Sequence, residues 1–168
     1  MQAFSYMQRS RGNLYIVANF AFAIFLLIYE TTSALYQLFP PLIGLFFALV
    51  LTMFFRKDKK FQKLDSSYYF VIFFLFFAEQ IHGFALFSIA ISFMIFYFLI
   101  FKILLKIIKI RNFILILAVI FGYVSPFLIT NALNFLLEEE TLKFGYEYAI
   151  YIVIESSLAV FLFRGKLI

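Results

Sequence analysis

The longest apolar stretch of the chain, Tyr68–Phe101, is interrupted by polar residues at one place, Glu79-Gln80-Ile81-His82-Gly83. As a single helix its 34 residues (68–101) would be about 51 Å long at ~1.5 Å per residue, which exceeds the ~30 Å hydrocarbon core of a bilayer. We therefore predict that the stretch folds back at this interruption into a hairpin of two shorter helices. The rest of the chain is expected to be arranged around this hairpin.

Basic segments flank the hairpin on both sides. Five Lys and Arg residues lie in Arg56–Lys63, before it, and four lie in Lys102–Arg111, after it. Because basic loops of membrane proteins tend to stay on the cytoplasmic side, two basic flanks require an even number of crossings between them. The charge pattern therefore supports two spanning helices here.

The same pattern along the whole chain predicts an all-α fold with six transmembrane helices in one domain, 1–168. Phe39-Pro40-Pro41 is expected to form the first reversal, because proline ends one helix and is tolerated in the first turn of the next. The loop 138–147 holds four Glu and one Lys, which places it opposite the basic loops. Basic residues before the first helix and after the last place both termini in the cytoplasm. The predicted helices span 14–38, 41–55, 68–82, 84–109, 112–137 and 148–163.

The composition fits a multi-pass membrane protein. The chain is 65% hydrophobic with 28 Phe, so it lacks enough polar surface for a soluble domain. Thirteen of its 14 Lys and Arg fall in segments assigned to the cytoplasm, so we expect membrane lipids, and no nucleic acid, among its partners. There is no Cys, which excludes disulfides and thiolate chemistry. No GxxxG motif is present, so helix packing is expected to rely on Ala, Ser and aromatic side chains.

Lys102, Lys106 and Lys109 follow the hairpin at positions i, i+4 and i+7, so they share one face of a helix. The residues between them are Ile and Leu, which predicts a basic amphipathic helix lying against the anionic cytoplasmic leaflet. Such a helix acts either as a topology signal, with lysines snorkelling to the interface, or as a docking surface for a partner.

Three carboxylates lie inside the predicted helices: Glu30, Glu79 and Glu155. A charged group within a bilayer costs at least ~2.5 kcal/mol, so such residues face the bundle interior or carry a function. Counting ~1.5 Å per residue from the predicted helix ends puts all three in the outer half of the bundle, close to His82. We expect some of them to be protonated, because desolvation and neighbouring like charges favour the neutral form of a carboxyl.

Two interpretations of these polar residues stay open. Glu30, Glu79, His82, Gly83 and Glu155 either surround a small cavity or partner-docking point, or they form hydrogen bonds that hold the helices together. Gly83 is expected to allow the tight reversal of the hairpin. A single His and no Cys argue against a metal site.

Sequence motifs for catalysis are missing. The two Asp of the chain, Asp58 and Asp65, both lie in a basic loop, which excludes an intramembrane aspartate pair. There is no HExxH motif, no glycine-rich phosphate loop and no Ser–His pair at a shared predicted depth. We therefore expect that the chain is not an enzyme and holds no cofactor.

At the reversal of the hairpin, the segment AEQIHGFALF (78–87) resembles the MreD family, the small membrane subunits of the bacterial rod-shape machinery. That family joins its third and fourth helices around an acidic residue, three mostly apolar positions, a Gly and then a Leu. Glu79, Gly83 and Leu86 correspond to these positions here. The chain departs from the pattern in two ways, since Glu79 replaces the usual Asp and Phe87 stands where a small residue is common.

The resemblance implies a non-enzymatic scaffold of the cell-wall elongation complex in the bacterial cytoplasmic (inner) membrane. MreD-like proteins bind the membrane anchor of MreC and sit with a transpeptidase and its glycosyltransferase partner. Glu79 and the turn beside it would then order the outer half of the bundle or meet a partner helix.

Two other classes remain open. The MreD family is similar in architecture to the substrate-binding subunits of energy-coupling-factor vitamin transporters, which commonly carry small residues at i and i+4 of the first helix. Here Ala18, Ala21 and Ala23 are present, but Phe22 stands where the partner of Ala18 would be needed. A small polytopic bacteriocin-immunity protein is the third class, and the sequence offers no positive signal for it.

Overall fold

Every regular element in the described residues is a helix, so the predicted all-α class is confirmed. The computed structural model describes residues 2–36, 39–60, 67–108 and 110–164. The elements are α1 (Gln2–Leu35), α2 (Ile43–Lys60), α3 (Ser67–Ile81), α4 (Ser88–Ile95), η1 (a π-helix, Phe96–Phe101), α5 (Lys102–Ile107), α6 (Arg111–Leu136) and α7 (Tyr146–Phe163). The helices α4, η1 and α5 follow one another without a break and form one continuous rod, Ser88–Ile107.

Four stretches of the described residues are long and apolar enough to cross a membrane, which identifies a transmembrane protein. The apolar part of α3 is shorter, and α2 ends in a charged run. Six crossings with both termini in the cytoplasm stay a prediction. The four stretches are Val17–Leu35, Ser88–Ile107, Asn112–Leu136 and Tyr146–Phe163.

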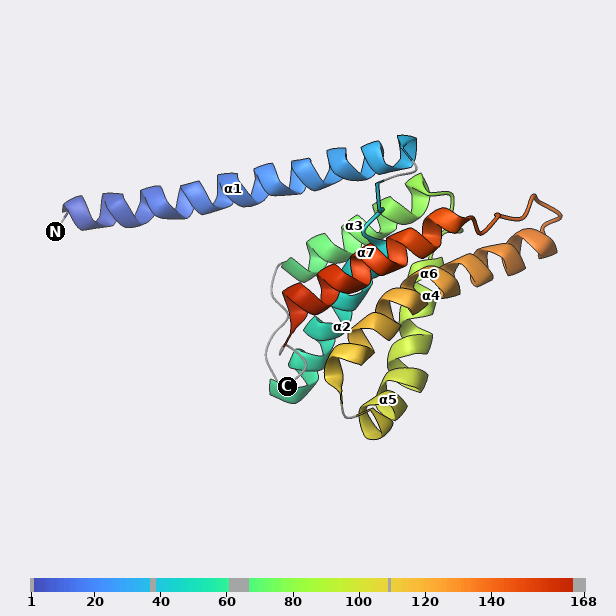
Figure 1. Cartoon of the computed structure of the whole chain (residues 1–168). Coiled ribbons are helices and arrows are strands. Elements are labelled where there is room, and N and C mark those ends of the chain that lie inside the picture. Colours follow the sequence, from blue (N-terminus) through green and yellow to red (C-terminus); the bar gives the residue numbers. More distant parts are fainter. Residues whose placement is uncertain (1, 37–38, 61–66, 109, 165–168) are drawn as a thin grey trace.

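Successive rods run in opposite directions, so the bundle has two distinct ends (Figure 1). Residues 39–42 and the loops 82–87 and 137–145 lie at one end, which we call the acidic end because Glu138, Glu139 and Glu140 are in its last loop. The helices α2, α5 and α7 terminate at the other end, which we call the basic end. Basic residues at this end include Arg56, Lys57, Lys60, Lys102, Lys106, Arg111 and Arg164.

The helix at the centre of the bundle is α2, which packs against α3, α6 and α7. Its residues Ile43, Phe47, Ala48 and Leu51 are completely buried. By contrast, α3 lies at the edge, and its Tyr69 is 71% exposed. The expectation that the chain is arranged around the 68–101 hairpin is therefore wrong, because the interior is formed by α2 together with α6, which packs against α2, α7 and the α4–α5 rod.

Glycines bring α2 close to α6. A Cβ atom added at Gly44 would lie 2.7 Å from Val119 Cγ1, and one added at Gly122 would lie 3.1 Å from Phe47 Cβ. The two glycines are on different helices, so no GxxxG motif marks them. The expectation of packing through Ala, Ser and aromatic residues alone misses this contact.

Several predicted helix bounds differ from the structure. The first helix, predicted as 14–38, is α1, which begins at Gln2 and ends at Leu35. The helix α2 continues to Lys60 instead of ending at Phe55, because basic side chains are favourable in the last turn of a helix. The predicted basic amphipathic helix is short, since α5 ends at Ile107. Lys102 and Lys106 are exposed on it, whereas Lys109 lies outside the described residues.

The long helix α1 stands apart from the other helices (Figure 1). It packs mainly on α3, near its own C-terminal end, where Leu26 and Glu30 are buried. Earlier along α1, Phe20, Phe22 and Phe25 are each at least 60% exposed. Most of the apolar surface of α1 is therefore not used for packing within the chain.

Candidate functional site

The three buried glutamates form separate contacts near the acidic end. Glu30, Glu79 and Glu155 are each completely buried, as expected for carboxylates inside a bundle. The structure joins Glu30 to His82, whereas Glu79 and Glu155 each bind the start of a different helix.

Glu79 binds the N-terminal end of α4 with both carboxylate oxygens. Oε1 accepts hydrogen bonds from the Ser88 hydroxyl (2.7 Å) and the Ile89 N–H (2.8 Å). Oε2 accepts one from the Phe87 N–H (3.1 Å). The first N–H groups of a helix lack partners within the helix and carry partial positive charge, so a carboxylate binds them well. Glu79 is thus a helix cap supplied by the preceding helix.

The turn between α3 and α4 is held from two sides. Gly83 has a φ of +73°, a left-handed conformation that favours glycine and agrees with the tight reversal expected there. The Phe84 N–H donates to the Glu79 carbonyl (3.0 Å). From α6, the Thr130 hydroxyl accepts a hydrogen bond from the Ala85 N–H (2.9 Å). This contact fixes the turn to the neighbouring helix.

Glu155, on α7, binds the start of α2 in a similar way. Its Oε2 accepts a hydrogen bond from the Leu45 N–H (2.8 Å), and its Oε1 accepts one from the Tyr123 hydroxyl of α6. The carboxylate therefore joins three helices. Gly44 leaves room for it, because a Cβ atom there would lie 3.0 Å from Oε2.

The two helices that receive a glutamate begin in the same unusual way. Leu42 before α2 and Phe87 before α4 have φ values of 56° and 69°. Left-handed backbone costs a non-glycine residue roughly 1–2 kcal/mol. Such a residue also directs neighbouring N–H groups toward one point, which suits an anion. Glu155 and Glu79 supply the accepting oxygens at these points, so the strained helix starts depend on them.

His82 connects the α3–α4 turn to α1. Its Nε2 atom lies 3.0 Å from Glu30 Oε1 and 3.3 Å from Ser33 Oγ. The expectation that no Ser–His pair shares a depth is therefore wrong. The helices α1 and α3 both end at the acidic end (Figure 1), and there the Ser33 and His82 side chains are in contact.

These three residues do not have the geometry of a catalytic triad. In a triad the carboxylate and the serine bind opposite ring nitrogens, whereas Glu30 and Ser33 both bind Nε2 of His82. The Ser33 hydroxyl also donates to the Glu30 carbonyl (2.8 Å), so its proton is already committed. The arrangement is a polar connection between two helices.

A polar pocket of ≈ 330 Å³ lies beside this connection. Its wall carries both a cation and a carboxylate, and the nearby Glu30 Oε2 is buried without a hydrogen-bond partner. The size falls within the range of small-molecule sites. Polar residues that line it are Ser33, His82, Lys143, Glu147, Tyr148 and Tyr151.

Side chains of α6 hold the 137–145 loop in place next to this pocket. Asn131 binds the Leu142 backbone twice, donating to its carbonyl (3.2 Å) and accepting from its N–H (2.7 Å). Asn134 donates to the Glu140 carbonyl (2.9 Å). The loop is therefore ordered by the helix that precedes it.

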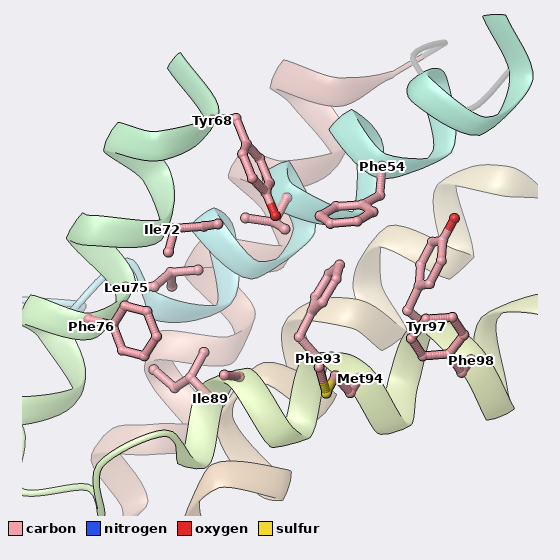
Figure 2. Close-up of a pocket in the computed structure, with 12 residues that line it drawn as sticks. Phe54, Tyr68, Ile72, Leu75, Phe76, Ile89, Phe93, Met94, Tyr97 and Phe98 are labelled. Carbon is pink, nitrogen blue, oxygen red and sulfur yellow. The ribbon is translucent and has the colours of Figure 1, made fainter. Parts of the chain in front are cut away.

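An apolar groove of ≈ 390 Å³ lies between α3 and the α4–η1 rod, with α2 as its floor (Figure 2). Its walls are almost entirely apolar. Figure 2 shows Phe54 of α2, Tyr68 of α3, and Phe93 and Tyr97 of the rod around it. Their sequence pattern does not differ from that of lipid-facing residues, so the groove was not predicted.

Other residues of these contacts were also missed from the sequence. Ser33 and Thr130 lie in apolar helices, where hydroxyl side chains usually bond to the backbone of their own helix and signal nothing further. In the described residues there is no group of three or more His, Asp or Glu side chains that could hold a metal ion.

None of the family models, curated proteins or solved structures compared with the chain matches it. The likeness to MreD therefore stays a prediction, carried by the segment 78–87 and the predicted topology.

Proposed function

We propose that this chain is a non-enzymatic membrane scaffold that binds transmembrane helices of partner proteins. The observation that carries the proposal is the position of α1, which is apolar, long, and packed on the rest of the chain mainly through α3. In lipid, helices associate by packing of their faces and by interhelical hydrogen bonds. The exposed phenylalanines of α1 offer such a face.

The polar contacts support a structural rather than a chemical role. Glu79 and Glu155 are occupied by the starts of α4 and α2, so neither carboxylate is left to act on a substrate. The hydroxyl of Ser33 is committed to a backbone carbonyl, which leaves His82 no nucleophile to activate.

The resemblance to MreD favours one complex, the cell-wall elongation machinery of the bacterial inner membrane. The partners would be an MreC-like membrane anchor and the transpeptidase with its glycosyltransferase. The residues of the resemblance lie in and beside the α3–α4 turn, where Leu86 and Phe87 are 55% and 53% exposed. This apolar turn is a second surface that a partner helix can meet.

Site-specific photo-crosslinking tests the proposal in the native membrane. A crosslinking residue at Phe22 or Phe25 of α1 is expected to capture a partner protein, identified by mass spectrometry as MreC, the transpeptidase or the glycosyltransferase. The matched control is Phe161 of α7, which is 82% exposed and is expected to capture lipid only. Protein capture that is equal at α1 and at Phe161, or absent from α1, contradicts the proposal.

The polar pocket favours a second candidate, a substrate-binding subunit of a small-molecule transporter. Lys143 and Glu147 give this pocket both charge signs, and the adjacent loop is ordered by Asn131. Affinity purification in mild detergent separates the two candidates. Recovery of ATP-binding subunits with a membrane coupling protein would favour the transporter and remove support from the scaffold.

A further inference from the structure

We propose that the groove between α3 and the α4–η1 rod binds one acyl chain of an anionic phospholipid, and that Lys57 and Lys102 bind its headgroup. This site does not rest on the proposed function: it lies on a different surface from α1 and from the polar pocket, and it borders the α3–α4 turn only at Phe87. The argument rests on the length of the groove, the rigidity of its walls and the charges at one end.

The groove has the length of one membrane leaflet. Along the rod it extends from Ile89 to Phe98, nine helical rises or about 14 Å at ~1.5 Å per residue. This is about half of the ~30 Å hydrocarbon core. Toward the acidic end, the rings of Phe76 and Phe87 meet edge to face with centroids 5.5 Å apart and close the gap between the helices. A partner helix would need a surface through both leaflets, whereas an acyl chain needs only one.

The walls of the groove are preformed. Three aromatic rings pack on one another there. The ring centroids are 5.2 Å apart for Phe54 and Phe93, 5.8 Å for Phe93 and Tyr97, and 5.5 Å for Phe54 and Tyr97. A preformed apolar wall lowers the cost of ordering side chains on binding. An acyl chain gains no hydrophobic free energy on leaving the bilayer for this groove, so packing and the headgroup must hold it.

Two lysines lie at the basic end of the groove, where the headgroup of a bound lipid would be located. The Lys57 Nζ atom lies 5.9 Å from the centroid of the Phe54 ring, and the Lys102 Nζ atom lies 5.9 Å from that of Phe98. Both rings line the groove, and both lysine side chains are exposed. The two cations therefore flank the basic end of an apolar channel.

The other charges at this end leave the balance positive. Asp58 accepts a hydrogen bond from the Tyr97 hydroxyl, so its carboxylate is engaged by a wall residue of the groove. Arg56 and Lys106 lie close by on α2 and α5 and add positive charge. A phosphate group is attracted to such a site, and a headgroup without net charge much less so.

Native mass spectrometry of the full-length protein, with added phosphatidylglycerol or with phosphatidylcholine carrying the same acyl chains, tests the site. The wild type is expected to retain one phosphatidylglycerol. Lys57→Gln combined with Lys102→Gln is expected to weaken that binding about thirtyfold, or about 2 kcal/mol. The matched control, Arg9→Gln on α1 with Lys143→Gln on the 137–145 loop, makes the same change in net charge away from the groove and should bind as the wild type does.

A second variant tests the groove itself. Ala90→Phe places a ring in the groove without touching either lysine and is expected to reduce retention of phosphatidylglycerol at unchanged thermal stability. Ala149→Phe, on the exposed side of α7, is its control. In addition, a photo-crosslinking residue at Met94 in the groove should capture lipid in the unaltered background.

Three results would overturn the proposal. One is equal retention of phosphatidylglycerol by the Lys57/Lys102 pair variant and its charge-matched control. Another is full retention by Ala90→Phe. The third is capture of a protein helix instead of lipid from Met94, which would assign the groove to a partner.

Discussion

Two of the three buried carboxyl groups, Glu79 and Glu155, accept hydrogen bonds from backbone N–H groups at helix starts. Glu79 receives three hydrogen bonds from the start of α4, and Glu155 receives one from the start of α2 and one from Tyr123. In hydrocarbon, an unsatisfied backbone N–H costs several kcal/mol, so a carboxylate inside the bundle and a helix start inside the bundle satisfy each other. Two of the three costly glutamates are explained in this way.

Replacing Glu79 by Gln is expected to lower the free energy of unfolding by about 1–3 kcal/mol. The amide keeps the shape but has one acceptor oxygen for three donors, and it turns an NH₂ group toward N–H groups. Thermal unfolding in detergent measures the change. Gln80→Ala, an exposed neighbour, is the control, and equal melting of the two variants would contradict the capping role.

Replacing Gly83 by Val is expected to cost roughly 1–2 kcal/mol, because its backbone is left-handed. A Cβ atom at Gly83 meets no atom within 4 Å, so the loss must come from backbone strain and not from a clash. Gly83→Asn should cost less, because Asn tolerates this conformation. Protein accumulation in the membrane and thermal stability measure the effect. A Val variant that is no less stable than the Asn variant would contradict the role of the left-handed backbone at Gly83.

At the level of elements, the decisive contact is the crossing of α2 and α6. It places α2 at the centre of the bundle and brings the N-terminal end of α2 to Glu155 on α7. The close approach requires that neither Gly44 nor Gly122 carry a side chain.

Gly44→Ala is expected to destabilise the bundle by about 1–3 kcal/mol, because the added methyl group overpacks a closed contact. It would lie 2.7 Å from Val119 Cγ1 and 3.0 Å from Glu155 Oε2. Val119→Ala in the same chain should restore part of the loss by removing the nearest atom. Detergent melting temperatures of the two single variants and the double variant measure this coupling. Simple additivity of the two losses would argue against the contact.

Across the whole molecule, charge separates along the axis of the bundle. Acidic residues lie in the 137–145 loop at one end, and basic residues lie where α2, α5 and α7 terminate at the other. Cytoplasmic loops of membrane proteins carry an excess of Lys and Arg, so this separation predicts the orientation of the protein in the membrane.

The orientation can be measured directly because the chain contains no Cys. A membrane-impermeant maleimide is expected to label Lys143→Cys in intact cells. Lys106→Cys should react only after the membrane is permeabilised. Labelling of both positions from the same side would contradict the predicted topology, and labelling of the wild type is the background control.

Part of the site was predictable residue by residue. The cost of charge in a bilayer singled out Glu30, Glu79 and Glu155, and all three are buried. The sequence also placed them close to His82, which contacts Glu30. The partners of Glu79 and Glu155 were not predictable, since Ser88, Leu45 and Tyr123 reach them only through turns and helix crossings. A helical position specifies depth and face, but it does not specify which neighbouring helix will lie opposite.

The apolar runs and the placement of Lys and Arg by themselves determined that the chain is helical and lies in a membrane, because hydrocarbon admits only backbone whose hydrogen bonds are satisfied internally. Tertiary structure decided what lies at the centre. Two single glycines far apart in sequence let α2 approach α6, so these two helices, and not the 68–101 hairpin, form the interior. The tertiary structure also created the groove beside α3, because a gap between three helices depends on how those helices diverge and not on the residues of any one of them.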